Sequence, residues 1–149
     1  MFMRQGRILG TVVSVLCLLT PCFAHHMAVV ADKENKTENV SSTQLAKIFK
    51  GEVKKWPDGR SMVVVTHGSS LDEIHTLAHL MKMSNAEVRA MIEERKDSIR
   101  KVATDADVIQ TVATTPGAIG MVEEHSITDR VRVIKVDGKL PMEAGYLPH

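Results

Sequence analysis

Aromatic side chains and cysteines are scarce in this chain of 149 residues, and both absences exclude functions. Aromatic residues make up 3% of the chain, and after position 24 they are limited to Phe49, Trp56 and Tyr146. So few rings provide little of the stacking surface that binds bases or sugars. The two cysteines, Cys17 and Cys22, lie near the start of the chain. The rest of the chain therefore has no disulfide, no thiolate metal site and no cysteine nucleophile.

Common catalytic motifs are also missing. The sequence contains no Gly-x-Ser-x-Gly nucleophile elbow and no phosphate loop that ends in Gly-Lys-Ser or Gly-Lys-Thr. Two acidic pairs, Asp72-Glu73 and Glu123-Glu124, are adjacent in sequence, which is typical of a solvated surface rather than of convergent acids. We therefore expect a protein that is not an enzyme and that uses no cofactor.

The first 24 residues have the pattern of a secretory signal peptide. Arg4 and Arg7 precede an apolar run over 8–20, and Ala24 is the small residue expected before a cleavage site. The apolar run is too short for a comfortable membrane span. We therefore predict a signal peptide at 1–24 and one mature domain at 25–149. The mature protein is expected to be secreted, in the periplasm, and to have no stable membrane span.

The predicted mature chain is long enough to bury a hydrophobic core of its own. The whole chain has a formal charge of +1, and removal of two arginines with the signal peptide leaves −1. A net charge so close to zero gives no sign of a nucleic-acid partner.

The apolar pattern predicts strands that alternate with helices. Strands are expected where short apolar runs occur, and helices where apolar residues recur at intervals of three and four. The expected strands are 27–31, 62–66, 118–122 and 131–136, and the expected helices begin near 41, 70, 84 and 105. The charged stretch 93–101 is expected to be a solvated helix end and loop. This order predicts an α/β fold with a mostly parallel sheet that helices cover on both faces.

The polar loop after the second predicted strand is the best candidate for a ligand site. A β-branched run ends at Thr66, and an amphipathic helix begins at Ser70. This order places the backbone N–H groups of Ser69, Ser70 and Leu71 at a helix N-terminus, where anions bind readily. Ser70 also has the spacing to Glu73 of an ordinary capping box, so a capped helix without a ligand is the alternative.

Two segments resemble the phosphate-type periplasmic solute-binding proteins of ABC transporters, in particular their short single-domain members. The segments are 45–59, which contains Ile48-Phe49-Lys50-Gly51 and Trp56, and 115–122, which reads Thr-Pro-Gly-Ala-Ile-Gly-Met-Val. The resemblance implies a single lobe of a type II periplasmic-binding-protein fold. It also implies a small, phosphate-like oxyanion as the ligand and an ABC permease or a sensor protein as the partner.

The same resemblance shows where this chain departs from the family. Family members hold the oxyanion between two lobes, whereas this chain has the length of about one, and a homodimer would supply the missing wall. The family's ligand loop resembles Arg-x-Asp-Gly-Ser-Gly-Thr, and Gly68 and Ser69 match it. Val65 stands at the arginine position, so the guanidinium that would grip phosphate is missing. His67 stands at the aspartate position and is positively charged only when protonated.

Oxyanion recognition at the helix N-terminus is the function that these observations favour. Thr115 and Gly117 are expected to border the same strand ends, because α/β sheets bind ligands beyond the carboxyl ends of their strands. The predicted ligand-binding residues are His67, Gly68, Ser69, Ser70, Thr115 and Gly117.

Two alternatives from other functional classes remain open. The missing arginine favours a sensory or protein-interaction module that has no small ligand and no role in transport. Three histidines favour a periplasmic protein that binds copper or zinc. His75 and His79 are one helical turn apart, and His25 would become the new N-terminus after signal cleavage.

Overall fold

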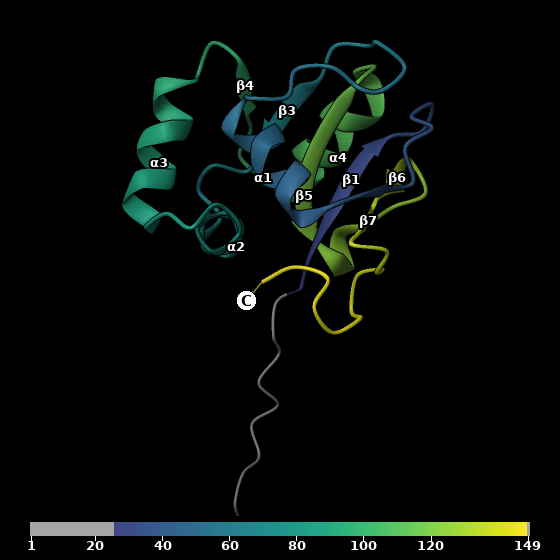
Figure 1. The fold of residues 1–149 in the computed structure, drawn as a ribbon. Coiled ribbons are helices and arrows are strands. Elements are labelled where there is room, and N and C mark those ends of the chain that lie inside the picture. The colour runs from purple at the N-terminus through teal and green to yellow at the C-terminus, as the bar shows by residue number, and fades with distance from the viewer. Residues whose placement is uncertain (1–25, 149) are drawn as a thin grey trace, which may run out of the picture.

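The computed structural model describes residues 26–148, so the predicted signal peptide and His25 lie outside the described residues. A five-stranded mixed sheet forms the centre of the fold, in the order β4-β3-β5-β1-β6 (Figure 1). β3 is parallel to β4 and β5, and β1 is antiparallel to β5 and β6. Every strand of this sheet except β1 therefore points the same way, as expected for a mostly parallel sheet. The strands are β1 (Met27–Asp32), β3 (Val63–Thr66), β4 (Ile99–Lys101), β5 (Ala118–Glu123) and β6 (Val131–Val133).

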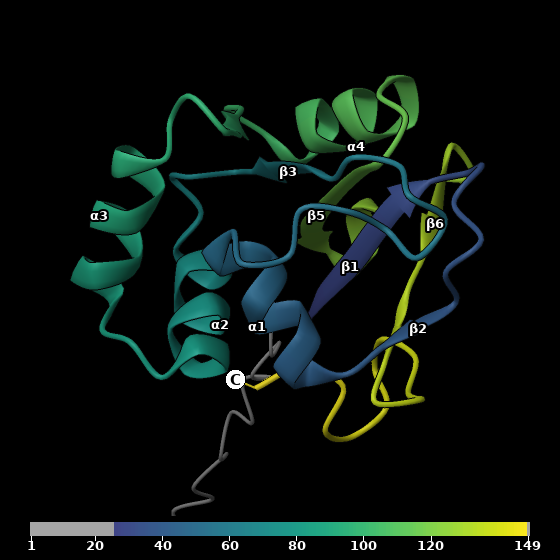
Figure 2. The ribbon, with the colours of Figure 1, turned by 45° about the horizontal axis from the view of Figure 1, so that its top comes forward.

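Helices cover both faces of the sheet, as Figure 2 shows. On one face α1 and α2 pack against the sheet and α3 packs against α2, and on the other face lies α4. β1 serves both faces, because Val29 belongs to the core under α1 and α2 while Val30 belongs to the core under α4. The helices are α1 (Ser42–Lys50), α2 (Leu71–Met81), α3 (Asn85–Glu94) and α4 (Asp105–Thr114), and a 3₁₀ turn, η1 (Glu124–Ser126), follows β5.

Local capping chemistry explains where the helices begin and end. The side chains of Ser41 and Ser84 accept hydrogen bonds from the backbone N–H groups of Gln44 and Glu87, and at Ser84 the capping box is complete. Gly51 ends α1 in a left-handed conformation, as its position in the sequence predicted. The four expected helices and the strands expected at 27–31, 62–66 and 118–122 are confirmed, with strand ends that differ by one residue.

Two sequence expectations about the strands are wrong. The strand expected over 131–136 is divided into β6 and β7 (Lys135–Val136), and β7 pairs in parallel with β2 (Asn39–Val40) outside the central sheet. The stretch 93–101, expected to be helix end and loop, ends in β4. Ile99 is the only buried residue of β4, and one apolar residue between charged ones leaves no detectable strand pattern.

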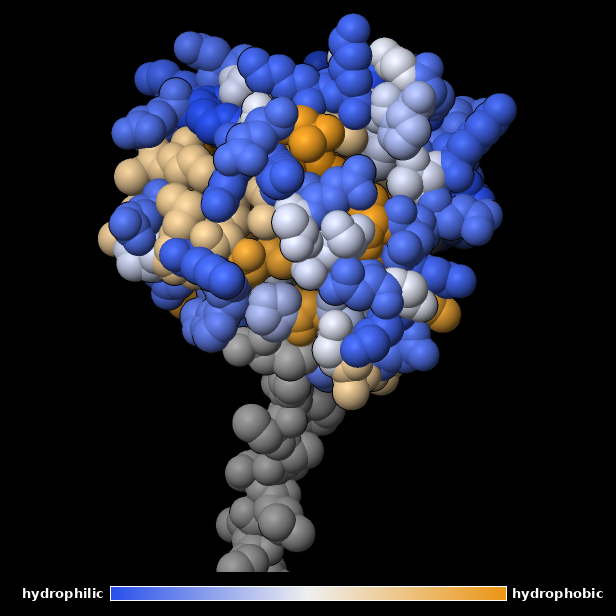
Figure 3. Space-filling model, in the orientation of Figure 1, coloured by the Kyte–Doolittle hydropathy of each residue, from blue (hydrophilic) through white to orange (hydrophobic). Residues whose placement is uncertain are grey.

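The surface of the described part of the chain is mostly hydrophilic in the orientation of Figure 1. Apolar surface lies mainly over the side of the molecule that α2 and α3 form (Figure 3). None of the helices in residues 26–148 combines the length and the apolar character that a membrane crossing requires.

Candidate functional site

The β3–α2 loop, residues 67–70, connects the carboxyl end of β3 to the N-terminus of α2. Ser70 is the N-cap residue, and its Oγ accepts a hydrogen bond of 3.2 Å from the backbone N–H of Glu73. The backbone N–H of Ser70 itself donates to the carbonyl of His67 at 2.8 Å. The expectation that this N–H is available to a ligand is therefore wrong, because the turn uses it.

Other donors of the loop remain available. Across residues 26–148, no protein acceptor receives a hydrogen bond from the backbone N–H of Gly68, Ser69 or Leu71, or from the hydroxyl of Ser69. Ser69 and Leu71 are exposed to solvent. Unsatisfied N–H groups in the first turn of a helix carry its positive partial charge. The loop therefore keeps the anion-binding character that the sequence predicted, with fewer donors from Ser70.

Glu73 does not complete the predicted capping box, and it is not a solvated surface residue. Its side chain is 0% exposed and accepts hydrogen bonds from Thr66 Oγ1 at 2.7 Å and from the backbone N–H of His67 at 2.8 Å. Burial raises the pKa of Glu73 from 4.5 to about 7, although both hydrogen bonds act to lower it. A buried carboxyl group that titrates near neutral pH thus holds the end of β3 and the start of the loop.

His67 is held by an acidic partner. Its Nδ1 lies 3.2 Å from Oδ1 of Asp105, and the other carboxylate oxygen of Asp105 accepts a hydrogen bond of 2.8 Å from the backbone N–H of Glu123. Asp105 begins α4 and Glu123 ends β5, so these contacts join the ends of several elements at the carboxyl edge of the sheet. A protonated His67 would form an ion pair with Asp105, which reduces the charge that it offers to an anion.

Lys101 is a cation beside the β3–α2 loop, and its position there was not predicted from the sequence. A Cβ atom placed on Gly68 would lie 2.7 Å from Lys101 Cε, so the aliphatic stem of Lys101 packs against the Gly68 backbone. The ammonium group is 3.9 Å from a carboxylate oxygen of Glu93, and the Lys101 side chain is 52% exposed. A long, exposed ion pair of this kind is weak. Lys101 therefore brings a positive charge to the loop that lacks the family's arginine.

Thr115 and Gly117 do not join this site. β3 and β5 are parallel with Val63 opposite Ala118, so the residues before β5 lie at the amino edge of the sheet. The β3–α2 loop lies at the carboxyl edge. The expectation that Thr115 and Gly117 border the same strand ends is therefore wrong.

Gly117 has a structural environment instead. Its N–H donates to Asp32 Oδ2 at 3.0 Å, and its carbonyl accepts from Trp56 Nε1 at 2.9 Å and from the Val63 N–H at 3.1 Å. The Thr115 hydroxyl accepts a hydrogen bond of 3.1 Å from the guanidinium of Arg100. These contacts explain why a glycine and a tryptophan occur in the two segments that carry the family resemblance.

The predicted metal ligands on α2 do come together. The Nε2 atoms of His75 and His79 are 3.2 Å apart and their ring centroids are 4.6 Å apart. In the part of the chain that the structure describes, no three His, Cys, Asp or Glu side chains converge on one metal position. The third predicted ligand, His25, lies outside the described residues.

Comparisons with known proteins agree on one family. The family model described as a PBP superfamily domain matches residues 20–138. The phosphate-binding protein PstS of Bacillus subtilis (strain 168) is 28% identical to this chain over 120 residues, which cover 77% of this chain and 37% of that protein.

Solved structures show the same fold. An ABC-type phosphate transport receptor from Vibrio cholerae matches with a TM-score of 0.63 and 19% identity, over 78% of this chain and 48% of that one. A putative phosphate ABC transporter substrate-binding protein from Clostridium perfringens, with bound phosphate, matches with a TM-score of 0.63 and 20% identity, over 76% of this chain and 45% of that one. This chain thus spans less than half the length of these relatives.

Proposed function

Because the chain belongs to the PBP superfamily, we propose that it is an exported solute-binding domain whose β3–α2 loop binds a small oxyanion, such as phosphate, for an ABC transporter. The observation that carries this proposal is that the N–H groups of Gly68, Ser69 and Leu71, at the N-terminus of α2, have no protein acceptor within residues 26–148. The hydroxyl of Ser69 adds a donor, and Lys101 adds a positive charge. Relatives whose names state phosphate binding support the choice of ligand.

The buried Glu73 makes the proposed affinity dependent on pH. Its ionised carboxylate, which accepts from the His67 N–H, repels an anion at the loop. Glu73 loses its charge below its pKa of about 7, so we expect tighter binding at pH 6 than at pH 8. Sulfate is the probe for this comparison because its charge stays constant over this range.

Leu71 offers a test that removes one N–H donor and leaves the helix intact. Leu71 is the first residue of α2, its side chain is 68% exposed, and Ser70 before it is extended (φ −69°, ψ 121°). Proline is favoured at this helix position and tolerates an extended residue before it. We expect Leu71→Pro to weaken phosphate binding about tenfold, since a hydrogen bond to a charged group is worth roughly 1.5–3 kcal/mol.

The matched control is Leu71→Ala, which removes the same side chain and keeps the N–H group. Isothermal titration with phosphate should give equal affinities for Leu71→Ala and wild type. Ser69→Ala should bind phosphate more weakly than wild type, because it removes the hydroxyl donor. Equal binding by Leu71→Pro and Leu71→Ala would contradict the proposed site.

A second copy of the chain is our proposed source of the second wall of this site, because Ser69 and Leu71 are exposed to solvent. We expect phosphate to promote dimerisation, which light scattering measures.

A second candidate function, binding of zinc or copper, is favoured by the separation of 3.2 Å between the Nε2 atoms of His75 and His79. Two nitrogen ligands of a tetrahedral zinc ion lie about 3.3 Å apart. We expect zinc to raise the melting temperature of the wild type and His79→Ala to lose this shift. His125→Ala, which removes an exposed histidine elsewhere, is the control. A shift that persists in His79→Ala would contradict a metal site at this pair.

A further inference from the structure

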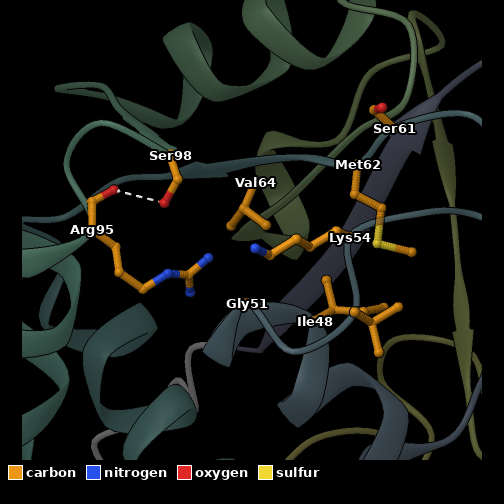
Figure 4. A pocket seen from close by; sticks show the side chains of 9 residues that line it. Ile48, Gly51, Lys54, Ser61, Met62, Val64, Arg95 and Ser98 are labelled. Atoms are coloured by element: carbon orange, nitrogen blue, oxygen red, sulfur yellow. Dashed lines mark hydrogen bonds between the residues drawn. The ribbon is translucent and has the colours of Figure 1, made fainter.

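A pocket lies at the amino edge of the sheet, away from the β3–α2 loop. It has a volume of about 340 Å³, which is within the usual range for small-molecule sites. It is formed where the end of α1, the segment after it, the start of β3 and the turn before β4 meet (Figure 4). Its lining residues are Ile48, Gly51, Val53, Lys54, Ser61, Met62, Val64, Arg95 and Ser98. We call it the Lys54–Arg95 pocket.

Two cations point into this pocket from opposite sides. Figure 4 shows the ammonium group of Lys54 and the guanidinium group of Arg95 directed toward each other. No acidic residue lines the pocket, and neither cation forms an ion pair with a carboxylate anywhere in the described range 26–148. Like charges that converge in a partly enclosed space repel each other. A bound anion between them would replace this repulsion with two attractions.

The backbone at the end of α1 holds the guanidinium group of Arg95 in place. Arg95 is the C-cap residue after α3, and its guanidinium donates a hydrogen bond to the carbonyl of Phe49 in the last turn of α1. A Cβ atom on Gly51 would lie 2.3 Å from one guanidinium nitrogen of Arg95, so the guanidinium lies directly against the glycine. Capping of α1 accounts for one N–H group of Arg95. The other N–H groups of the guanidinium have no protein acceptor in the part of the chain that the structure describes, so they remain for a ligand.

Apart from the two cations, the pocket is lined by apolar side chains and by the hydroxyl groups of Ser61 and Ser98. Val53, Met62 and Val64 provide aliphatic and thioether surface, and the hydroxyl of Ser61 has no protein partner within residues 26–148. A fully hydrated inorganic ion makes no use of this apolar surface, whereas the hydrocarbon part of an organic acid does. The planar guanidinium also matches the geometry of a carboxylate.

From these observations we propose that the Lys54–Arg95 pocket binds a small aliphatic carboxylate. The carboxylate lies between Lys54 and Arg95, and the short hydrocarbon chain rests on Met62 and Val64. This site is separate from the proposed oxyanion site, which uses the opposite edge of the sheet.

Two adjacent lysines provide a matched test. Lys54→Met removes the charge and keeps most of the side-chain length, and Lys55→Met makes the same change at an exposed neighbour that does not line the pocket. Butyrate is the probe, and the methyl resonances of Ile48 and Met62 report binding in NMR titrations. We expect saturable shifts in wild type and Lys55→Met, and affinity reduced at least about tenfold in Lys54→Met. Leu71→Pro should respond as the wild type does, which separates this site from the proposed function.

Butanol and inorganic phosphate are the two ligand controls. Butanol, which has the same chain without the charge, should cause no saturable shift, and inorganic phosphate should bind the pocket more weakly than butyrate. Absence of butyrate shifts, equal responses of Lys54→Met and Lys55→Met, or equal responses to butanol would overturn the proposal. Phosphate binding as tight as butyrate binding would overturn the preference for a carboxylate.

Discussion

Glu73→Gln is expected to raise the free energy of unfolding at pH 8 by about 3 kcal/mol. The wild-type carboxylate is fully buried, and its pKa in the folded protein is about 7 compared with 4.5 for an ordinary glutamate. Glutamine removes the buried charge and keeps both contacts, because its carbonyl accepts from the His67 N–H and its amide donates to Thr66 Oγ1.

The stability gained by Glu73→Gln depends on pH. Between pH 4.5 and about 7 the folded protein holds a proton on Glu73 that the unfolded chain has released. The wild type therefore loses stability as the pH rises through this range. Glu73→Gln lacks this loss, so its advantage should be present at pH 8 and absent near pH 4.

Urea unfolding of both proteins from pH 4 to pH 8 measures this difference. Glu87→Gln is the control, because Glu87 is an exposed capping residue whose pKa is lowered rather than raised. Parallel pH profiles for wild type and Glu73→Gln would contradict the assignment of Glu73 as a buried titrating group.

Gly117→Ala is expected to destabilise the protein by about 3 kcal/mol or more. Gly117 has a φ of +80°, and an added Cβ atom would lie 2.1 Å from the backbone carbonyl oxygen of Ser61. Neither atom belongs to a flexible side chain, so β3 and β5 would have to separate locally. This separation would also disturb the hydrogen bonds from Gly117 to Asp32 and from Trp56 to Gly117.

Gly59→Ala separates the cost of backbone strain from the cost of the steric clash with Ser61. Gly59 has a similar φ of +87°, but an added Cβ atom would meet nothing within 4 Å. Its substitution should therefore cost only the backbone strain, about 1 kcal/mol. Thermal unfolding of both variants measures the difference, and equal losses would contradict the close packing described for Gly117.

The membership in the PBP superfamily and the observed sheet agree with a single lobe of a periplasmic-binding-protein fold, as the sequence resemblance implied. Helices were predictable where capping residues flank a periodic apolar face, as at Ser41 and Ser84. β4 was not predictable from the sequence, because its pairing with β3 depends on contacts between distant residues and not on its own apolar pattern.

The candidate site was predictable only where it depends on local sequence. The order of strand, polar loop and capped helix correctly located the donors of Ser69 and Leu71. A Ser-x-x-Glu sequence does not tell whether the glutamate returns to cap the helix or turns into the core, and Glu73 turns into the core. The position of Lys101 depends on β4, so it was not predictable without that strand. The position of Gly117 away from the loop was predictable, because a residue before a parallel strand lies at the amino edge of the sheet.

The most direct test of the proposed oxyanion site is a phosphate titration followed by the backbone amide resonances of the protein. The account predicts saturable shifts of the Gly68, Ser69 and Leu71 amides, because these N–H groups have no protein acceptor within the described residues. A titration in which these amides do not move, or in which the shifts are confined to residues around Lys54 and Arg95, would contradict it.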